Sequence, residues 1–418
     1  MDRRIRLAFV IQRYGEMITG GAEQLCRHIV EHLTGEYDID VLTTTARDYT
    51  SWKNYYVSGR ERVAGLNIRR FPVEAEYSRH GFRWRTRLLF RLPHSDHQEI
   101  RWIESQGPYC PAMIDYILRN RNNYDLLIFF SYRYYPSFFG ISLVGNSSIL
   151  VPTAEHDDTI YLRTYRQMFS KPRGIIYLSP EEKSLIERVS SNTRVPNAVI
   201  GIGIEPPSDL SVERALEKYM LGQPYLLYVG RIDENKGCAT LFQFVTRFFE
   251  EFPDSPYRLV LAGNRAMDIP NHSRIHHLGY VNDRDKFSII RGCEVMLMPS
   301  RYESLSIVTL EGMAMGKPLV VNAQCEVLAG HCRRSGAALA YRTYKEFASQ
   351  LLKLNASAEL RGEMGQRGRA YVEANYNWPD VKQRYHNFIT SLLAQPPEHA
   401  AAVGEIADEV SPSSGGRR

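Results

Sequence analysis

The chain has 418 residues, which is enough for two or three domains, and two domains of roughly 180 to 200 residues would each bury a substantial core. Hydrophobic residues make up 44% and charged residues 24% of the sequence, a composition typical of a globular protein rather than a disordered one. The net charge of +5 excludes a strongly basic nucleic-acid-binding protein, but it is compatible with a basic patch that faces phosphate or an anionic membrane.

The cysteines and the amino terminus indicate the compartment in which the protein works. The six cysteines form no C-x-x-C pair, which argues against a zinc site or a disulfide scaffold and favours a reducing compartment. They are Cys26, Cys110, Cys238, Cys293, Cys325 and Cys332. The apolar run near the amino terminus has about six residues, too short for the core of a signal peptide, and no stretch approaches the roughly 18 apolar residues of a membrane-spanning helix. We therefore expect a cytoplasmic protein.

Short apolar runs alternate with helical patterns through most of the chain. In the first half, we expect buried strands at 6–11, 39–43, 126–130, 148–151 and 174–178. In the second half, we expect them at 225–229, 258–261, 295–298 and 318–321. Continuous apolar runs joined by helices predict parallel sheets covered on both faces, and such sheets bind ligands at the carboxyl ends of their strands.

The pattern restarts after residues 197–205 and the polar stretch 206–213, where we place the link between two doubly wound α/β domains that face a cleft. The predicted domains are residues 1–203 and 204–377, followed by a last helix over 378–395. The tail 396–418 is rich in Ala, Pro, Ser and Gly and is predicted to be disordered.

Gly20 and Gly21 follow the first predicted strand and precede an amphipathic helix that runs to Leu33. Glycines at a helix start let backbone amides approach an anion, with the positive end of the helix dipole behind them. The spacing differs from the G-x-G-x-x-G of dinucleotide-binding domains, and an ordinary strand-to-helix turn explains the two glycines equally well.

A second loop, 230–237, follows the predicted strand 225–229 and leads into a helix. Its Arg231 and Lys236 lie five residues apart between two glycines, so that a guanidinium fork and a point charge can converge on one diphosphate. The loop is not a Walker motif, because the G-x-x-x-x-G-K-[ST] pattern is absent. A solvated, charged surface loop is the alternative interpretation.

The strongest pattern lies in residues 299–318, where we expect a helix from about Ser304 to Gly316 after the strand 295–298. Glu303 precedes this helix and Glu311 lies eight residues further on, a helical rise of roughly 12 Å. That rise matches the length of a sugar–diphosphate–ribose unit, so one carboxylate can bind hydroxyls at each end. The amides of three residues between them would face the diphosphate, namely Leu305, Ser306 and Ile307. A solvated Glu311 is the alternative, but apolar residues on several sides of this helix favour a buried, partnered carboxylate.

These three patterns together resemble the family 4 glycosyltransferases, which are retaining, nucleotide-sugar-dependent enzymes with the two-domain GT-B fold. The resemblance covers roughly residues 5–395 and rests on the following segments: Gly20-Gly21-Ala22-Glu23, Gly230-Arg231 with Lys236-Gly237, and the Glu-x7-Glu of Glu303 and Glu311. The family usually has Gly-Phe-Gly after the first glutamate, where this chain has Ser304-Leu305-Ser306, and commonly Ala after the second, where it has Gly312. In this fold the last helix, here 378–395, crosses back onto the amino-terminal domain.

The resemblance implies a role for each charged site residue. Arg231 and Lys236 would stabilise the leaving diphosphate. Glu311 would bind the ribose hydroxyls, and Glu303 would bind the hydroxyls of the donor sugar near C3. His156 follows the strand 148–151, where the family has a histidine near the C6 hydroxyl of the donor sugar; a structural or surface histidine is the alternative. The base of the nucleotide would lie against the ends of two further strands, at Gly263, Asn264, Tyr280 and Val281.

We expect no cofactor and no catalytic metal, only a UDP- or GDP-linked nucleotide sugar as co-substrate. In a retaining front-face reaction the acceptor hydroxyl attacks beside the leaving phosphate, which can itself take the proton, while fixed cations and amides stabilise the departing diphosphate. Two D-x-D patterns could suggest a metal. However, Asp38 and Asp40 fall in the second strand, and Asp283 and Asp285 fit a helix cap.

Residues 60–101 hold ten arginines against five acids, with aromatic residues between them, as in Phe82-Arg83-Trp84-Arg85. The segment fits an anionic membrane or a lipid-diphosphate acceptor, and membrane glycosyltransferases of this fold often dock through such a face; a solvated loop and helix is an equal alternative. Residues 132–135, Tyr-Arg-Tyr-Tyr, are predicted either to line the acceptor cleft or to pack between the domains.

The sequence therefore predicts a GT-B glycosyltransferase that is cytoplasmic, or held peripherally on the inner face of the membrane. It would transfer a hexose, with retention, from a nucleoside-diphosphate sugar to a hydroxyl of a surface polysaccharide or a lipid-linked oligosaccharide. One alternative is a sugar-nucleotide epimerase of the same fold, although that family lacks the Glu-x7-Glu spacing. Another is a non-catalytic nucleotide-sugar-binding scaffold, although a scaffold does not need all four charged residues, Arg231, Lys236, Glu303 and Glu311. No nucleic-acid partner is expected, because the basic segment is short and no recognition motif is present.

Overall fold

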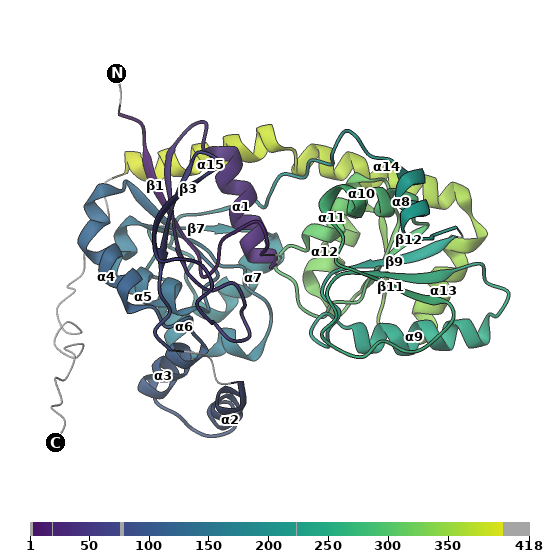
Figure 1. Cartoon of the computed structure of the whole chain (residues 1–418), viewed down its shortest axis with the longest axis horizontal. Helices are drawn as coiled ribbons and strands as arrows, with labels where there is room; N and C mark the ends of the chain where they lie inside the picture. Colours follow the sequence, from purple (N-terminus) through teal and green to yellow (C-terminus); the bar gives the residue numbers. More distant parts are fainter. Residues whose placement is uncertain (1–2, 19, 76–78, 223, 396–418) are drawn as a thin grey trace.

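The computed structural model describes residues 3–18, 20–75, 79–222 and 224–395, which form two α/β domains side by side (Figure 1). The tail 396–418, predicted to be disordered, lies outside the described residues. Each domain is built on its own parallel or mainly parallel sheet, with helices packed around it. The predicted fold class, two doubly wound α/β domains, is therefore confirmed.

In the described part of the amino-terminal domain, eight strands form one sheet in the order β3-β4-β2-β1-β5-β6-β7-β8. Neighbouring strands are parallel except β3 and β4, which are antiparallel at one edge. The strands are β1 (Arg6–Val10), β2 (Asp38–Thr44), β3 (Gly59–Val63), β4 (Leu66–Phe71), β5 (Leu126–Phe130), β6 (Ser148–Val151), β7 (Gly174–Tyr177) and β8 (Asn197–Val199). The helices are α1 (Gly21–Leu33), α2 (Arg79–Leu89), α3 (Asp96–Gln106), α4 (Pro111–Asn120), α5 (Tyr135–Val144), α6 (Arg163–Met168) and α7 (Pro180–Ser190).

The carboxy-terminal domain has a parallel sheet in the order β11-β10-β9-β12-β13-β14. Its strands are β9 (Tyr225–Val229), β10 (Arg258–Ala262), β11 (Ile275–Gly279), β12 (Val295–Met298), β13 (Leu319–Asn322) and β14 (Ala338–Tyr341). Its helices are α8 (Val212–Lys218), α9 (Cys238–Glu251), α10 (Asp283–Gly292), α11 (Ile307–Ala314), α12 (Glu326–Ser335), α13 (Tyr344–Ala356) and α14 (Ala358–Asn375), and α15 (Trp378–Ala394) follows. Within the described ranges, no helix combines the length and the apolar character that crossing a membrane requires.

All nine predicted strands are present, and their ends agree with the prediction to within one residue. The predicted strand ranges leave out β3, β4, β8, β11 and β14, which lie at or next to the sheet edges; β11 was expected only as a strand end before Tyr280. An edge strand has one open side and needs no continuous apolar run, and β3 is in fact exposed along its whole length. Residues 197–199 form β8 and pair with β7, so they lie within the predicted amino-terminal domain, residues 1–203.

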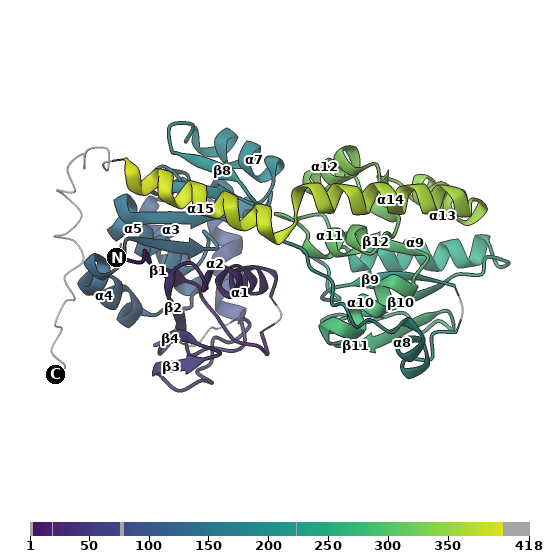
Figure 2. The same ribbon diagram turned by 90° about the horizontal axis from the view of Figure 1, so that it is seen from above.

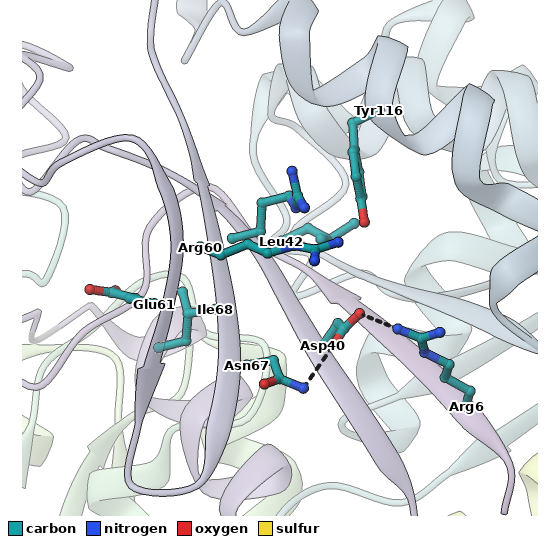
Figure 3. A pocket seen from close by; sticks show the side chains of 9 residues that line it. Arg6, Asp40, Leu42, Arg60, Glu61, Asn67, Ile68 and Tyr116 are labelled. Atoms are coloured by element: carbon teal, nitrogen blue, oxygen red, sulfur yellow. Dashed lines mark hydrogen bonds and ion pairs between the residues drawn. The ribbon is translucent and has the colours of Figure 1, made fainter.

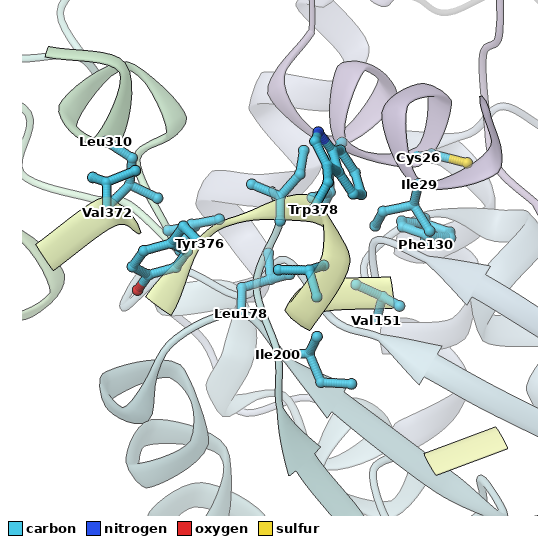
Figure 4. Packing of buried hydrophobic residues seen from close by; sticks show 14 of the residues in the cluster. Cys26, Ile29, Phe130, Val151, Leu178, Ile200, Leu310, Val372, Tyr376 and Trp378 are labelled. Carbon is cyan, nitrogen blue, oxygen red and sulfur yellow. The ribbon is translucent and has the colours of Figure 1, made fainter. Parts of the chain in front are cut away.

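Helix α15 leaves the carboxy-terminal domain after α14 and runs along the amino-terminal domain (Figure 2). It is fixed there by an ion pair between Lys382 and Glu36 at 2.8 Å and by buried Tyr385 and Ile389. At the crossing, Trp378 stacks on His32 of α1 with a ring-centroid distance of 3.5 Å. Figure 4 shows this region, where buried residues of both domains form one hydrophobic cluster.

The facing sides of the two domains also make polar contacts. Ser179, which caps α7 of the amino-terminal domain, donates its hydroxyl hydrogen bond to the carbonyl oxygen of Ser304 at 2.8 Å. Glu181 of the same helix forms an ion pair with Arg334 of α12 at 2.5 Å. The segment that precedes α11 is therefore held against the amino-terminal domain, and this places the Glu303–Glu311 element at the domain interface.

Candidate active site

Glycines bring three loops together at the carboxyl end of the second sheet. A Cβ atom at Gly263, after β10, would lie 2.0 Å from the carbonyl oxygen of Gly230, after β9. A Cβ atom at Gly237 would lie 2.2 Å from the carbonyl oxygen of Pro299, after β12, and Gly237 has a φ of 75°. Only glycine permits both the close approach and this backbone conformation. The loops that carry Arg231, Lys236 and Glu303 are therefore packed against one another.

Lys236 and Glu303, both predicted site residues, form an ion pair with 2.8 Å between Nζ and Oε1. Both side chains are half-buried. Burial alone would lower the pKa of Lys236, but the charges of Glu303 and Glu155 and the hydrogen bond to Glu303 outweigh it, so that this pKa is raised. Lys236, on the loop that follows β9, therefore keeps its positive charge.

Glu311 forms a second lysine–carboxylate pair, on the neighbouring helix. Its Oε1 accepts a hydrogen bond from Lys286 of α10 at 2.6 Å, and Lys286 also lies 3.1 Å from Asp283. Burial opposes the charge on Lys286, but Glu311 and Asp283 raise its pKa overall. Oε2 of Glu311 is buried and has no hydrogen-bond partner within the described residues. The expectation of a buried, partnered carboxylate is met, and the unpartnered oxygen leaves an acceptor for a ligand.

Arg231 is held by one residue from each domain. Its Nε forms an ion pair with Asp233, and its Nη1 donates a hydrogen bond to the hydroxyl of Tyr49 at 2.8 Å. The other oxygen of Asp233 accepts the backbone N–H of Lys236 at 2.8 Å. Asp233 thus fixes the two cationic residues of the loop relative to each other.

Helix α11 begins at Ile307, three residues later than predicted, because Ser306 adopts a left-handed conformation with a φ of 63°. The family resemblance places a glycine here, which takes this conformation without strain. Ser306 instead hydrogen-bonds through its hydroxyl to that of Thr309 at 2.8 Å, and the carbonyl oxygen of Leu305 lies 2.8 Å from Nε2 of His331. The first backbone N–H groups of α11 have no acceptor within the helix and point out of its amino-terminal end. Glu303 precedes this end in the sequence.

The structure gives Gly20 a packing role. A Cβ atom there would lie 2.1 Å from Oε2 of Glu23 and 3.0 Å from Nη2 of Arg13, and those two side chains form a buried ion pair at 2.6 Å. A Cβ atom at Gly21 would meet nothing within 4 Å. The predicted approach of these amides to an anion stays a prediction.

His156 is exposed, and its Nε2 lies 2.7 Å from the hydroxyl of Tyr161 in its own domain. In the described residues it makes no hydrogen bond or ion pair with the carboxy-terminal domain. Its neighbour Glu155 is the residue that faces Lys236 and Glu303. Burial raises the pKa of Glu155, with Glu303 acting in the same direction and Lys236 opposing it. The sequence analysis did not single out Glu155, because its position depends on how the chain turns after β6.

The predicted base-binding residues lie at the ends of the adjacent strands β10 and β11. The carbonyl oxygen of Asn264 accepts the backbone N–H of Ile232 at 2.9 Å, and the backbone N–H of Gly263 donates to the carbonyl oxygen of Gly279 at 2.8 Å. Tyr280 is largely exposed and Val281 is buried beside it. This edge therefore presents an aromatic ring next to the loop of Arg231.

The aspartates of the two D-x-D patterns are engaged by neighbouring side chains. Asp40 is occupied by Arg6 and Tyr124, and Asp285 by Lys218, whereas the cap of α10 is Asn282 and not an aspartate. No cluster of three or more potential metal-ligating side chains occurs in the part of the chain that the structure describes.

Residues 132–135 pack mainly within the amino-terminal domain and not between the domains. Tyr132 and Tyr135 are buried, Arg133 pairs with Asp157, and the ring of Tyr134 meets that of Trp52 edge-on at 5.6 Å. A cavity of about 160 Å³ lies beside β2 and β4, lined by Arg6, Asp40 and Arg69 among others (Figure 3). Its charges largely balance, and none of the predicted site residues lines it.

Comparison with known proteins places this geometry in context. Residues 223–357, from β9 through α13, match the model of the family described as glycosyl transferases group 1. The D-inositol 3-phosphate glycosyltransferase of Corynebacterium urealyticum is 25% identical over 237 residues, which are 51% of this chain and 54% of that protein. The matched region thus spans about half the length of this curated relative.

Solved structures extend the likeness to nearly the whole chain. The sucrose-phosphate synthase of Thermosynechococcus elongatus superimposes with a TM-score of 0.67 and 16% identity, covering 94% of this chain and 100% of that one. The E. coli trehalose-6-phosphate protein bound with UDP-2-fluoro glucose gives a TM-score of 0.68 and 16% identity, with the same coverage. The fold is therefore GT-B, as predicted. The family match supports a group 1 glycosyltransferase over 223–357, and the narrower family 4 assignment stays a prediction.

Proposed function

We propose that this chain is a retaining glycosyltransferase that moves a hexose from a UDP- or GDP-linked sugar to a hydroxyl of a glycan or lipid-linked acceptor. One observation carries the proposal: two lysine–carboxylate pairs lie at the two ends of the segment 303–311, Lys236–Glu303 before α11 and Lys286–Glu311 within it, and Arg231 is on the same loop as Lys236. The match of residues 223–357 to the group 1 glycosyl transferases covers all five of these residues and supports the proposal.

The arrangement suggests how a donor would bind. The unpartnered Oε2 of Glu311 would accept hydrogen bonds from the ribose hydroxyls, while Oε1 stays fixed by Lys286. The diphosphate would lie against the first amides of α11, with Arg231 and Lys236 as its cations. Lys236 would then exchange part of its contact with Glu303 for a phosphate oxygen, and Glu303 would turn its acceptor capacity to the hydroxyls of the sugar.

The charges also suggest the mechanism. As the bond between the anomeric carbon and the phosphate oxygen breaks, its electron pair leaves with the diphosphate, and fixed cations stabilise this negative charge in the transition state. The acceptor oxygen forms the new bond on the same face, and its proton passes to the departing phosphate. This route uses no protein nucleophile and no metal. His156 is kept in the proposal as a residue that reaches the sugar only after a rearrangement of the segment that follows β6.

Helix α2 supports an anionic membrane as a further partner. Trp84 and Leu88 are exposed four residues apart on α2, Leu92 is exposed just after the helix, and residues 79–92 include five arginines and no acid. The opposite side is anchored, because Phe82 stacks on Trp102 of α3 at 5.3 Å and Trp102 donates to the hydroxyl of Thr86 at 2.9 Å. In Figure 1 this helix projects from the amino-terminal domain at a distance from the carboxy-terminal one. An exposed face of Trp, Leu and Arg fits the interface of an anionic bilayer.

The first test is a thermal-shift panel of UDP, GDP, ADP, CMP and dTDP, without metal and then with Mg²⁺. A ligand of the folded state at 100 times its Kd stabilises it by about 2.7 kcal/mol. A shift with UDP or GDP in the absence of metal would support the proposal and identify the base. No shift with any nucleotide would contradict it.

A second test separates the enzymatic alternatives. The protein is incubated with the nucleotide sugar of the identified base, and the products are followed by proton NMR. Release of the nucleoside diphosphate with the α-anomer of the sugar formed first from an α-linked donor supports retention. An epimerised nucleotide sugar without such release favours the epimerase, and binding without any turnover in the presence of glycan acceptors favours the scaffold.

A further inference from the structure

Tyr49 of the amino-terminal domain contacts Arg231 of the carboxy-terminal domain. It lies between β2 and β3, and its hydroxyl accepts a hydrogen bond from Nη1 of Arg231 at 2.8 Å. The guanidinium carbon of Arg231 lies 5.1 Å from the centroid of the tyrosine ring, which is within the range of a cation–π contact. No motif in the sequence marks Tyr49, because the two residues are far apart along the chain.

The amino-terminal side of this contact is anchored in the core of its domain. The guanidinium of Arg13 lies 5.3 Å from the same tyrosine ring. Arg13 is buried and binds Glu23 of α1 through Nη2 at 2.6 Å and Nε at 2.9 Å, and its Nη1 donates to the carbonyl oxygen of Arg47 at 3.0 Å. Both nitrogens contact the same carboxylate oxygen, Oε1, and a buried, charged pair held by two hydrogen bonds has little freedom to move. Tyr49 therefore rests on a rigid support.

The carboxy-terminal side fixes the plane of the Arg231 guanidinium. Arg231 has five N–H groups; Nε–H is directed to Asp233 and one Nη1–H to Tyr49. Among the described residues, nothing binds the other hydrogen of Nη1 or the two hydrogens of Nη2, and together these form a fork that can bind phosphate in a bidentate way. Two contacts in one plane, one from each domain, thus set the direction in which this fork points.

We propose that Tyr49 is a positioning residue of the diphosphate site, supplied by the domain that does not bind the nucleotide. It orients Arg231 toward the diphosphate, so that recognition of the second phosphate depends on contact between the two domains. This inference rests on the proposed function, in which Arg231 binds the diphosphate, and it adds a residue from the opposite domain. The arginine is then fully ordered only when Tyr49 and Asp233 both hold it.

The test compares a nucleoside diphosphate with the matching monophosphate. The full-length Tyr49→Phe variant keeps the ring and loses only the hydroxyl. Titration calorimetry without metal measures the Kd of UDP and UMP, or of GDP and GMP if guanine is the base that stabilises the wild-type protein. We expect the affinity for the diphosphate to fall on the order of tenfold, which is about the effect of losing one charged hydrogen bond. The affinity for the monophosphate should stay within about twofold of the wild-type value.

Tyr55→Phe is the matched control. Tyr55 belongs to the same connection, is largely exposed, and stacks with Arg47 at 4.4 Å. This variant should keep the wild-type ratio of the monophosphate Kd to the diphosphate Kd. Tyr49→Ala removes the cation–π contact as well and should lower this ratio further than Tyr49→Phe does.

Two outcomes overturn different claims. If Tyr49→Phe keeps the wild-type preference for the diphosphate, the positioning role is wrong while the proposed function stands. If the wild-type protein binds none of these nucleotides, the proposed function is rejected together with the inference. A general weakening of both ligands by Tyr49→Phe also overturns the positioning role, because it indicates a disturbed fold rather than a misdirected guanidinium.

Discussion

Nζ of Lys286 lies 2.6 Å from Oε1 of Glu311, while Oε2 of the same carboxylate is buried and without a hydrogen-bond partner among the described residues. The carboxylate is therefore immobilised through one oxygen and open to a ligand through the other. A buried acceptor that lacks a partner is unfavourable, so a ligand hydroxyl placed there would recover interaction energy. Under the proposed function, this relationship would link the stability of the carboxy-terminal domain to the binding of ribose.

We predict that Lys286→Met destabilises the protein by about 3–5 kcal/mol, because it leaves the carboxylate of Glu311 buried and unpaired. Urea unfolding measures the loss. The double variant Lys286→Met with Glu311→Leu removes both charges and should regain most of the stability, but it should not regain nucleotide binding. If Lys286→Met is as stable as the wild type, pairing with Lys286 is not needed to keep the buried carboxylate of Glu311 in the folded protein.

We predict that Lys236→Ala lowers the single-turnover rate of donor cleavage by 10²–10³-fold, about 3–4 kcal/mol, because the ammonium faces the charge that develops on the diphosphate. The nucleotide sugar of the base identified in the thermal-shift panel is the substrate. Lys382→Ala, which removes the ion pair of α15 with Glu36, is the control and should leave the rate unchanged. A wild-type rate for Lys236→Ala would reject its role.

The central strands of both sheets could be predicted because they are buried on both faces and are therefore uninterrupted apolar runs. The edge strand β11, Ile-His-His-Leu-Gly, carries no such signal because only part of it is covered. The start of α11 was misplaced for a local reason: a serine with a positive φ gives no sign of that conformation in its sequence. Element ends that depend on such a residue are visible only in the structure.

The charged residues of the candidate site were predictable where they share one local motif, as do Glu303 and Glu311. Lys286, Tyr49 and Glu155 were missed, because each enters the site through the packing of a separate element. Lys286 and Asp283 look in sequence like an ordinary helix-surface pair three residues apart. His156 was chosen for its place after β6. The chain passes through a positive φ at Thr153, and it is the residue before His156 that faces the other domain.

Gly20 and Gly21 provide a prediction that separates packing from ligand binding. Gly20→Ala would place a Cβ atom against the carboxylate of Glu23 and should destabilise the protein by about 1–3 kcal/mol. Gly21→Ala meets nothing within 4 Å and should be neutral or stabilising by up to about 1 kcal/mol. Thermal unfolding measures both changes. If Gly21→Ala keeps its stability but loses the shift given by the diphosphate, the predicted anion approach at Gly21 gains support.

His331 gives the stability a dependence on pH. Burial lowers its pKa to about 4, against the opposing effect of the Leu305 carbonyl oxygen, so the folded protein holds this ring neutral. Between about pH 6.5 and 4 the unfolded chain binds the proton and the folded one does not, so stability falls as the pH is lowered, by about 2 kcal/mol at pH 5. Urea unfolding at pH 7 and 5 should show a smaller loss for His331→Gln than for the wild type. His97→Gln, at an exposed position of α3, should keep the wild-type loss.

The exposed face of α2 predicts binding to anionic vesicles through apolar and cationic side chains together. The wild-type protein should co-sediment with phosphatidylcholine vesicles that contain 30% phosphatidylglycerol, and far less with phosphatidylcholine alone, because attraction to the anionic surface contributes about 1 kcal/mol to binding for each neighbouring arginine. Trp84→Ala should weaken binding at every salt concentration, because Trp84 is 70% exposed and its indole would insert at the interface. Arg85→Gln with Arg87→Gln should weaken it mainly at low salt, where charges are least screened.

The matched control is Tyr161→Ala, which removes an aromatic ring that is 48% exposed elsewhere on the same domain and should leave binding unchanged. If Trp84→Ala and the double arginine variant bind the anionic vesicles as well as the wild type does, any membrane contact is made by another surface.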